Sequence, residues 1–276
     1  MTRPLLLATA AVAAAACGGG RGTTTIAGHG GAGPRGPALV YLDWGQDAVF
    51  EADCWAPDAG GCDAARAKAQ AGGVLVAGGA RFTLGATRDE ECGASGDVAK
   101  VVGYTRAAGP ADATPGIAVF PADAAVDLRP QHDSPGAPAW IAPLLVPLAA
   151  ADLVGSDRAR PIAPGEIQVT QVVEANVAGG PQPDLLIAAG VPLGDSDGPG
   201  YVWSALVLIP DGDRGAAVSL WHSDLEALSI GATYDLDGDG VSAFIWTASY
   251  YEGASTGAAH IAGGKLVIGA TVGCGA

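Results

Sequence analysis

The chain has 276 residues and a formal net charge of −15, and only 16% of its residues are charged, while 43 are glycine and 19 are proline. A surface with this acidic balance repels nucleic-acid phosphates, so we expect no nucleic-acid partner. The length suits one large or two small domains and is sufficient to build a hydrophobic core.

Residues 1–16 have the pattern of an export signal, because Arg3 precedes an apolar run that ends in small residues. Cys17 directly after Ala14-Ala15-Ala16 resembles the lipobox of bacterial lipoproteins, in which this cysteine is lipidated and becomes the first residue. The resemblance implies a lipid anchor as the only membrane contact, in the periplasm or at the outer membrane of a cell envelope. The alternatives are an ordinary cleaved signal or a short membrane anchor, although the run is too short to span comfortably.

Residues 17–37 are rich in Gly, Thr, Pro and Ala, which is typical of a flexible tether. Beyond Cys17 the chain has Cys54, Cys62, Cys92 and Cys274, an even number that predicts two disulfides in an oxidising compartment. Four cysteines allow three pairings, among which the sequence does not choose. A zinc site is the alternative use, but the chain has no Cys-x-x-Cys pair.

Residues 38–160 are predicted to form a β-rich domain whose turns are heavy in Gly, Pro and Asp. Two short helices are expected within it, Asp63–Ala71 and Trp140–Leu153, the second kinked by Pro143 and Pro147. The predicted strands are Ala38–Leu42, Val74–Ala77, Arg81–Leu84, Val98–Tyr104 and Ile117–Phe120.

Residues 161–276 contain an internal repeat with an offset of 59 residues. The segment Asn176–Asp184, followed by apolar residues, superimposes on Asp235–Ala243, also followed by apolar residues. A loop and a buried strand therefore recur, as expected of a repeated sheet unit. The predicted strands here are Ile167–Val173, Leu185–Ala189, Tyr201–Ile209, Val241–Ser249 and Lys265–Ala270.

The second copy of this repeat contains Asp235-Leu236-Asp237-Gly238-Asp239-Gly240 before an apolar strand. This pattern resembles the FG-GAP and VCBS type repeats of integrin-like propellers, and the chain looks like two degenerate copies of them. The resemblance implies calcium between strands. A complete seven-bladed ring needs more units than the chain contains. We therefore predict a mainly β protein with a partial propeller-like stack of antiparallel sheets and few short helices.

The aspartate loop is the predicted metal site because its closely spaced carboxylates repel one another unless a cation neutralises them. Asp235, Asp237 and Asp239 would supply side-chain oxygens, and Val241 would supply its backbone carbonyl. The predicted ion is a weakly bound, structural calcium, because Ala243 stands where the repeat pattern expects an acid. The alternative is a solvated acidic turn without an ion.

His222 is followed closely by Asp224 and Glu226, which could form a general-base group, and Trp221 could stack on a sugar. Because neither a plausible nucleophile spacing nor a second catalytic pair accompanies these residues, a solvent-exposed loop is the favoured interpretation. The leading hypothesis is a non-enzymatic, lipid-anchored, calcium-stabilised binding or structural module with a protein or glycan ligand. The first rival is an exported hydrolase of glycans or peptides with its site in the N-terminal domain, which a pocket that gathers acids with His132 or His222 would favour. The second is a structural component with an empty aspartate loop.

Overall fold

The computed structural model describes residues 38–42, 47–51, 74–77, 80–92, 97–110, 117–120, 127–131, 133–134, 136–194, 200–235, 238–250 and 253–275. Within these residues the protein consists mainly of antiparallel strands, arranged in three sheets. The prediction of a mainly β protein with few helices is therefore confirmed. None of the helices in the described part has the length and apolar character needed to cross a membrane.

The N-terminal sheet has six strands in the order β1-β2-β5-β4-β3-β6, and β6 pairs with β1 as well as with β3. Its longest pairing joins β4 and β5, where the hydroxyl groups of Thr83 and Thr105 lie 3.0 Å apart. The strand bounds are β1 Ala38–Leu42, β2 Asp47–Glu51, β3 Val74–Ala77, β4 Ala80–Cys92, β5 Asp97–Ala108 and β6 Ile117–Phe120.

The C-terminal part contains two further sheets. The four-stranded sheet has the order β11-β10-β9-β8, and the five-stranded sheet has the order β15-β14-β13-β12-β7. The bounds of the first are β8 Gln168–Ala175, β9 Asp184–Pro192, β10 Tyr201–Ile209 and β11 Val218–Ser223. Those of the second are β7 Asp127–Pro130, β12 Ala227–Asp235, β13 Ala243–Tyr250, β14 Gly253–Ala262 and β15 Lys265–Gly275.

The 59-residue offset seen in the sequence is also an offset between strands. Strand β12 begins 59 residues after β8, and β13 begins 59 residues after β9. Each copy then continues as an up-and-down arrangement of four neighbouring strands. The repeat therefore corresponds to one antiparallel sheet per copy.

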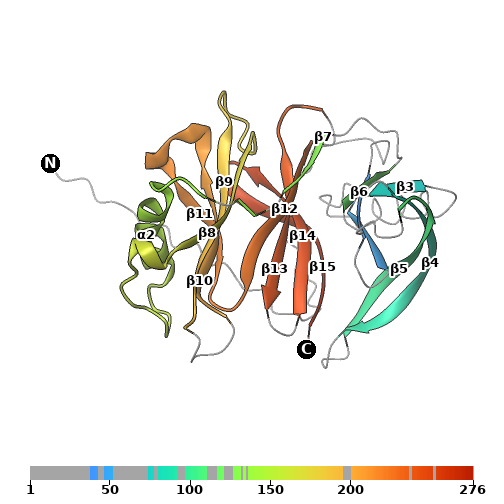
Figure 1. Cartoon of the computed structure of the whole chain (residues 1–276), viewed down its shortest axis with the longest axis horizontal. Coiled ribbons are helices and arrows are strands. Elements are labelled where there is room, and N and C mark those ends of the chain that lie inside the picture. Colours follow the sequence, from blue (N-terminus) through green and yellow to red (C-terminus); the bar gives the residue numbers. More distant parts are fainter. Residues whose placement is uncertain are drawn as a thin grey trace.

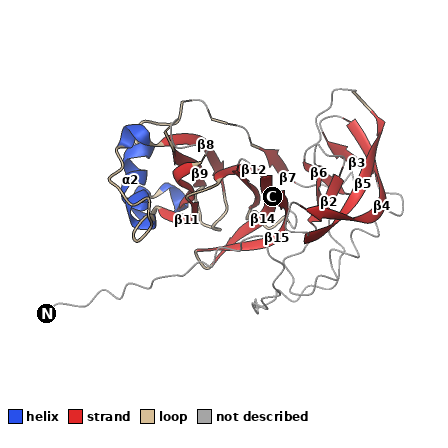
Figure 2. Ribbon diagram, turned by 90° about the horizontal axis from the view of Figure 1, so that it is seen from below, coloured by secondary structure: helices blue, strands red, loops and turns tan. Residues whose placement is uncertain are grey.

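The helix α2, Ile141–Asp152, covers one face of the four-stranded sheet, and the five-stranded sheet covers the other (Figure 1). The six-stranded sheet lies beyond the five-stranded one in both views (Figures 1 and 2). Three short 3-10 turns complete the described helical structure: η1 Pro164–Glu166, η2 Pro210–Gly212 and η3 Arg214–Ala216.

Strands β9 and β10 have apolar side chains on both faces because each face is covered by another layer. Ile187, Trp203 and Val207 pack toward α2 and its buried residue Leu145. Leu186 and Leu206 point the other way and contact Phe244 and Trp246 of β13. Two cores, one on each side of a single sheet, therefore hold this half of the protein together.

Gln171 joins the two C-terminal sheets through a buried side-chain amide. Its Nε2 donates to the carbonyl oxygen of Ile230 at 3.0 Å, and its Oε1 accepts from the backbone N–H of the same residue at 2.6 Å. The two residues are 59 positions apart, so they occupy equivalent places in the two copies. The amide thus pairs with β12 as a neighbouring strand would.

The predicted helix Trp140–Leu153 is confirmed as α2, which contains Pro147. The helix expected at Asp63–Ala71 lies outside the described residues. Segment 127–160, which the sequence grouped with the N-terminal domain, packs on the C-terminal sheets through β7 and α2. The strands not anticipated from the sequence are β2, β7, β11, β12 and β14.

Candidate functional site

The aspartate loop follows β12 and is closed by the carboxylate of Asp235. One oxygen accepts a hydrogen bond from the backbone N–H of Gly238 at 2.8 Å, and the other accepts from Gly240 at 2.9 Å. Both glycines have positive φ, 75° and 83°, a region that side chains disfavour. The glycines therefore allow the backbone to turn around this carboxylate.

The residues of this loop fit a hard cation by their chemistry. Each carboxylate oxygen has a second lone pair, so the backbone contacts of Asp235 leave acceptor capacity for an ion. The carboxylate of Asp239 accepts the backbone N–H of Val241 at 2.7 Å. Val241, the residue predicted to bind through its carbonyl, therefore lies next to a second carboxylate. Asp237, the central predicted ligand, lies outside the described residues. Within the described part, no cluster of three or more His, Cys, Asp or Glu side chains is placed to hold a metal.

The corresponding loop of the first copy lies directly against the aspartate loop. The Nδ2 of Asn176 donates to the carbonyl of Gly240 at 2.8 Å, and the carbonyl of Asn176 accepts from the N–H of Ser242 at 2.6 Å. A Cβ added to Gly179 would lie 3.5 Å from a methyl group of Val241. The two repeat loops therefore form one continuous contact at the end of the stacked sheets.

A different carboxylate organises the first loop. Asp184 is completely buried, and one of its oxygens accepts the N–H groups of Val177 and Ala178, at 2.8 and 2.7 Å. Its other oxygen accepts the N–H of Asp211 at 2.8 Å. Asp184 stands where the second copy has Ala243. Each loop thus depends on one carboxylate, placed at its end in the first copy and at its beginning in the second.

A second polar cluster lies where α2 ends on the four-stranded sheet. The Oδ2 of Asp152 accepts the indole N–H of Trp203 at 2.9 Å and the hydroxyl of Ser219 at 2.8 Å. Its Oδ1 lies 3.4 Å from Nδ1 of His222. The carboxylate side chain is 14% exposed and the imidazole is 44% exposed, so the pair lies at the surface with its acidic member inward.

A bulge in β11 produces this cluster. In the pairing with β10, Leu206 lies opposite Trp221 and Val207 lies opposite Ser219, so Leu220 is an extra residue. Such a bulge re-aims the side chains on either side of it. Leu220 and Trp221 both pack toward the core between the sheets, while Ser219 and His222 both reach Asp152.

The structure therefore changes one prediction about β11. Asp152, more than sixty residues earlier in the chain, is the carboxylate beside His222, in place of Asp224 or Glu226. Trp221 is half-buried and packs perpendicular to Trp246, with ring centroids 4.6 Å apart. Asp152 and Ser219 were missed because neither the helix end nor the bulge can be read from the local pattern.

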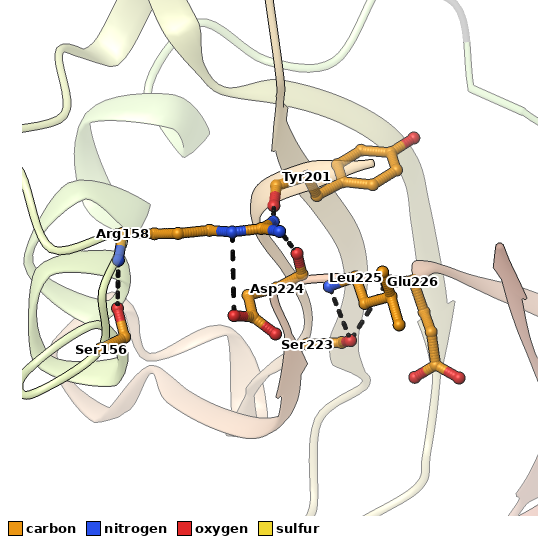
Figure 3. A network of polar contacts seen from close by, with 7 residues as sticks. All are labelled: Ser156, Arg158, Tyr201, Ser223, Asp224, Leu225 and Glu226. Atoms are coloured by element: carbon orange, nitrogen blue, oxygen red, sulfur yellow. Dashed lines mark hydrogen bonds and ion pairs between the residues drawn. The ribbon is translucent and has the colours of Figure 1, made fainter. Parts of the chain in front are cut away.

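Arg158 ties the segment after α2 to the sheet (Figure 3). Its guanidinium donates to the backbone carbonyls of Tyr201 and Asp224, and its Nε lies 3.9 Å from the carboxylate of Asp224. The Asp224 side chain is thereby directed toward Arg158. This network explains structurally why Asp224 is not the partner of His222.

The remaining predicted site residues are the cysteines. Cys92 ends β4 and Cys274 lies in β15, opposite Ala254, but the description there covers the backbone alone. Cys17, Cys54 and Cys62 lie outside the described residues. The disulfide pairing and the lipidation site therefore stay predictions.

The chain was compared with known proteins at three levels. No protein-family model matches it, and neither a curated protein nor a solved structure shows a significant similarity.

Proposed function

We propose that this protein is an exported, lipid-anchored module of the cell envelope that binds a protein or glycan and is stabilised by calcium at the aspartate loop. Asp235, Asp237 and Asp239 would bind the ion through their carboxylates, and Val241 through its carbonyl. Cys17 would carry the lipid. The ion would have a structural role, because the carboxylates that hold it are no longer available for acid–base chemistry.

The observation that carries this proposal is the contact between the two repeat loops. Asn176 bonds to both Gly240 and Ser242, so the position of the aspartate loop is coupled to the first copy. An ion that orders residues 235–241 therefore also favours the docking of the two sheets. This arrangement supports a calcium ion that stabilises the fold of the C-terminal half.

The calcium site can be tested by titrating the chain, without residues 1–37, with calcium in a calorimeter. We expect a dissociation constant of roughly 10⁻⁴ to 10⁻³ M, as in extracellular calcium modules. At a calcium concentration about tenfold above that constant, the folded state should gain about 1.4 kcal/mol. The variant Asp237→Ala should lose both the heat of binding and the rise in melting temperature.

The matched control is Asp213→Ala, which removes an exposed carboxylate that accepts one N–H, from Gly215. This variant should bind calcium as the wild type does. A wild-type protein that shows neither heat nor thermal stabilisation in millimolar calcium would contradict the metal site.

The anchor is tested separately in cells of a Gram-negative host. Globomycin, which blocks the lipoprotein signal peptidase, should cause the unprocessed chain to accumulate, and Cys17→Ser should abolish lipid labelling. Normal processing of the wild type in the presence of globomycin would contradict lipidation, whatever the outcome of the calcium titration.

A further inference from the structure

His222 has the environment of an oriented proton acceptor. The Asp152 carboxylate is held by the buried indole of Trp203 and by the Ser219 hydroxyl, which both donate to Oδ2. These two bonds fix the remaining oxygen, Oδ1, toward Nδ1 of His222. The neutral imidazole next to a carboxylate places its proton on the facing nitrogen, here Nδ1.

The consequence is that the lone pair of the ring lies on Nε2. The imidazole side chain is 44% exposed, so the ring is open to solvent. Asp152 and His222 therefore combine a fixed tautomer with an accessible basic nitrogen.

We propose that His222 is the general base of a hydrolytic site that acts on carboxylic esters. Nε2 accepts a proton from a water molecule, and the oxygen of that water forms a bond to the ester carbonyl carbon. The bond from this carbon to the alkoxy oxygen then breaks, and the oxygen leaves with the electron pair and receives the proton from the imidazolium. The products are a carboxylic acid and an alcohol, so water is the only co-reactant.

The three side chains have different roles in this reaction. His222 alone contacts the reacting water, and it is the catalytic residue. Asp152 is a positioning residue, because it acts through Nδ1. Ser219 directs its proton to Asp152, so it orients the carboxylate and is not a nucleophile. An ester is the expected substrate because its alkoxy oxygen leaves more readily than an amide nitrogen, and this site has one proton carrier.

The activity is tested with the full chain and p-nitrophenyl acetate at neutral pH, by following p-nitrophenolate release. Positioned general bases accelerate reactions by about 10² to 10⁴-fold, so His222→Gln should lower the protein-dependent rate by about 10²-fold. His260→Gln, which changes a histidine in β14, should keep the wild-type rate. Hydrolysis should be slower in D₂O because a proton moves in the rate-determining step. Equal rates for the wild type and His222→Gln would overturn the proposal.

Asp152 is the last residue of α2, so its substitution could also weaken the packing of the helix. Its role must therefore be tested by a measurement that a loosened helix would change in the opposite direction. At a pH above about 8.5, where an ordinary imidazole is neutral, we expect Asp152→Asn to slow the carbethoxylation of His222 by diethyl pyrocarbonate, measured by mass spectrometry with His260 as the internal reference. If Asp152 only fastened α2 to the sheet, its loss would expose the ring and speed up this modification. An unchanged or faster reaction at His222 would therefore remove Asp152 from the proposed site. Ser219→Ala, which keeps the carboxylate, should slow ester hydrolysis less than Asp152→Asn.

Discussion

At the scale of single residues, the buried carboxylate of Asp184 provides hydrogen-bond acceptors where the backbone has no strand or helix partner. Asp184 is fully buried and accepts three backbone N–H groups that lie in a loop and in a turn. The Asp184 carboxylate therefore takes the place of the backbone carbonyls that a strand or an α-helix would offer to these N–H groups. The charge of Asp184 is stabilised by the donors, and the donors are satisfied by the charge.

We therefore expect Asp184→Ala to lower the free energy of unfolding by about 3 kcal/mol, because it leaves one buried and two part-buried N–H donors unpaired. Asp213→Ala removes an exposed carboxylate with one N–H contact and should cost no more than about 1 kcal/mol. Urea denaturation of the two variants measures the difference. Equal destabilisation would show that burial of Asp184 does not matter.

Among the residues that the structure describes, Glu166 is the one whose ionisation is most clearly set by its surroundings. The backbone N–H of Ala163, at 2.7 Å, is the main cause that lowers the pKa of Glu166 from 4.5, and Arg160 at 2.7 Å lowers it further. A carboxyl group whose pKa is lower in the folded state adds stability above its unfolded value, and this stability is lost as pH falls through the folded value.

The thermal stability of the wild type should therefore exceed that of Glu166→Gln at neutral pH, and this advantage should shrink as the pH falls below about 4.5. Melting temperatures of both proteins across this range provide the measurement. An advantage that grows toward acid would contradict the sign of the pKa change.

At the scale of elements, the Gln171 side-chain amide links the two copies by hydrogen bonds to the backbone of β12, as a paired strand would. Gln171 occupies both hydrogen-bonding groups of Ile230, in a position that is 4% exposed. Each pairing also has a bulge close to this point, between Val169 and Gln171 in β8 and between Ile230 and Ala232 in β12. The bulges interrupt the regular ladders where the amide inserts.

Gln171→Ala should lower the free energy of unfolding by about 2 to 4 kcal/mol, since two buried backbone groups of β12 lose their partner. Gln168→Ala, on an exposed position of the same strand, should change it by less than about 0.5 kcal/mol. Chemical denaturation distinguishes the two. A Gln171→Ala protein as stable as the Gln168→Ala control would mean that the two sheets do not depend on this contact.

The sequence predicted the elements that have strong local patterns. Tyr201–Ile209 and Ala38–Leu42 match β10 and β1, and the helix around Leu145 has buried residues at every fourth position. Strand β14 was missed because it consists mainly of Gly and Ala residues, which have little strand propensity of their own. It forms because β13 and β15 pair with both of its edges.

At the scale of the whole molecule, the two repeat sheets share one core. Phe244 of the five-stranded sheet is fully buried among side chains of the four-stranded sheet, including Leu186 and Leu206. Neither sheet can lose this contact without exposing apolar surface on the other. The two copies should therefore behave as one folding unit.

Phe244→Ala should cost about 3 to 5 kcal/mol, the usual range for removing a buried aromatic ring. Hydrogen exchange followed by mass spectrometry should then show faster exchange in peptides from β8–β10 as well as in peptides from β12–β14. Faster exchange confined to β12–β14 would mean that each copy is stable on its own.

The sequence by itself determined the β character of the chain, the helix after Trp140 and the 59-residue spacing of the copies, because these follow from local apolar patterns and turn residues. The tertiary structure decided which groups meet: Asn176 with Gly240, Gln171 with Ile230, and Asp152 with His222. These contacts join distant segments through a bulge, a helix end and a sheet junction, and no short window of residues encodes such geometry.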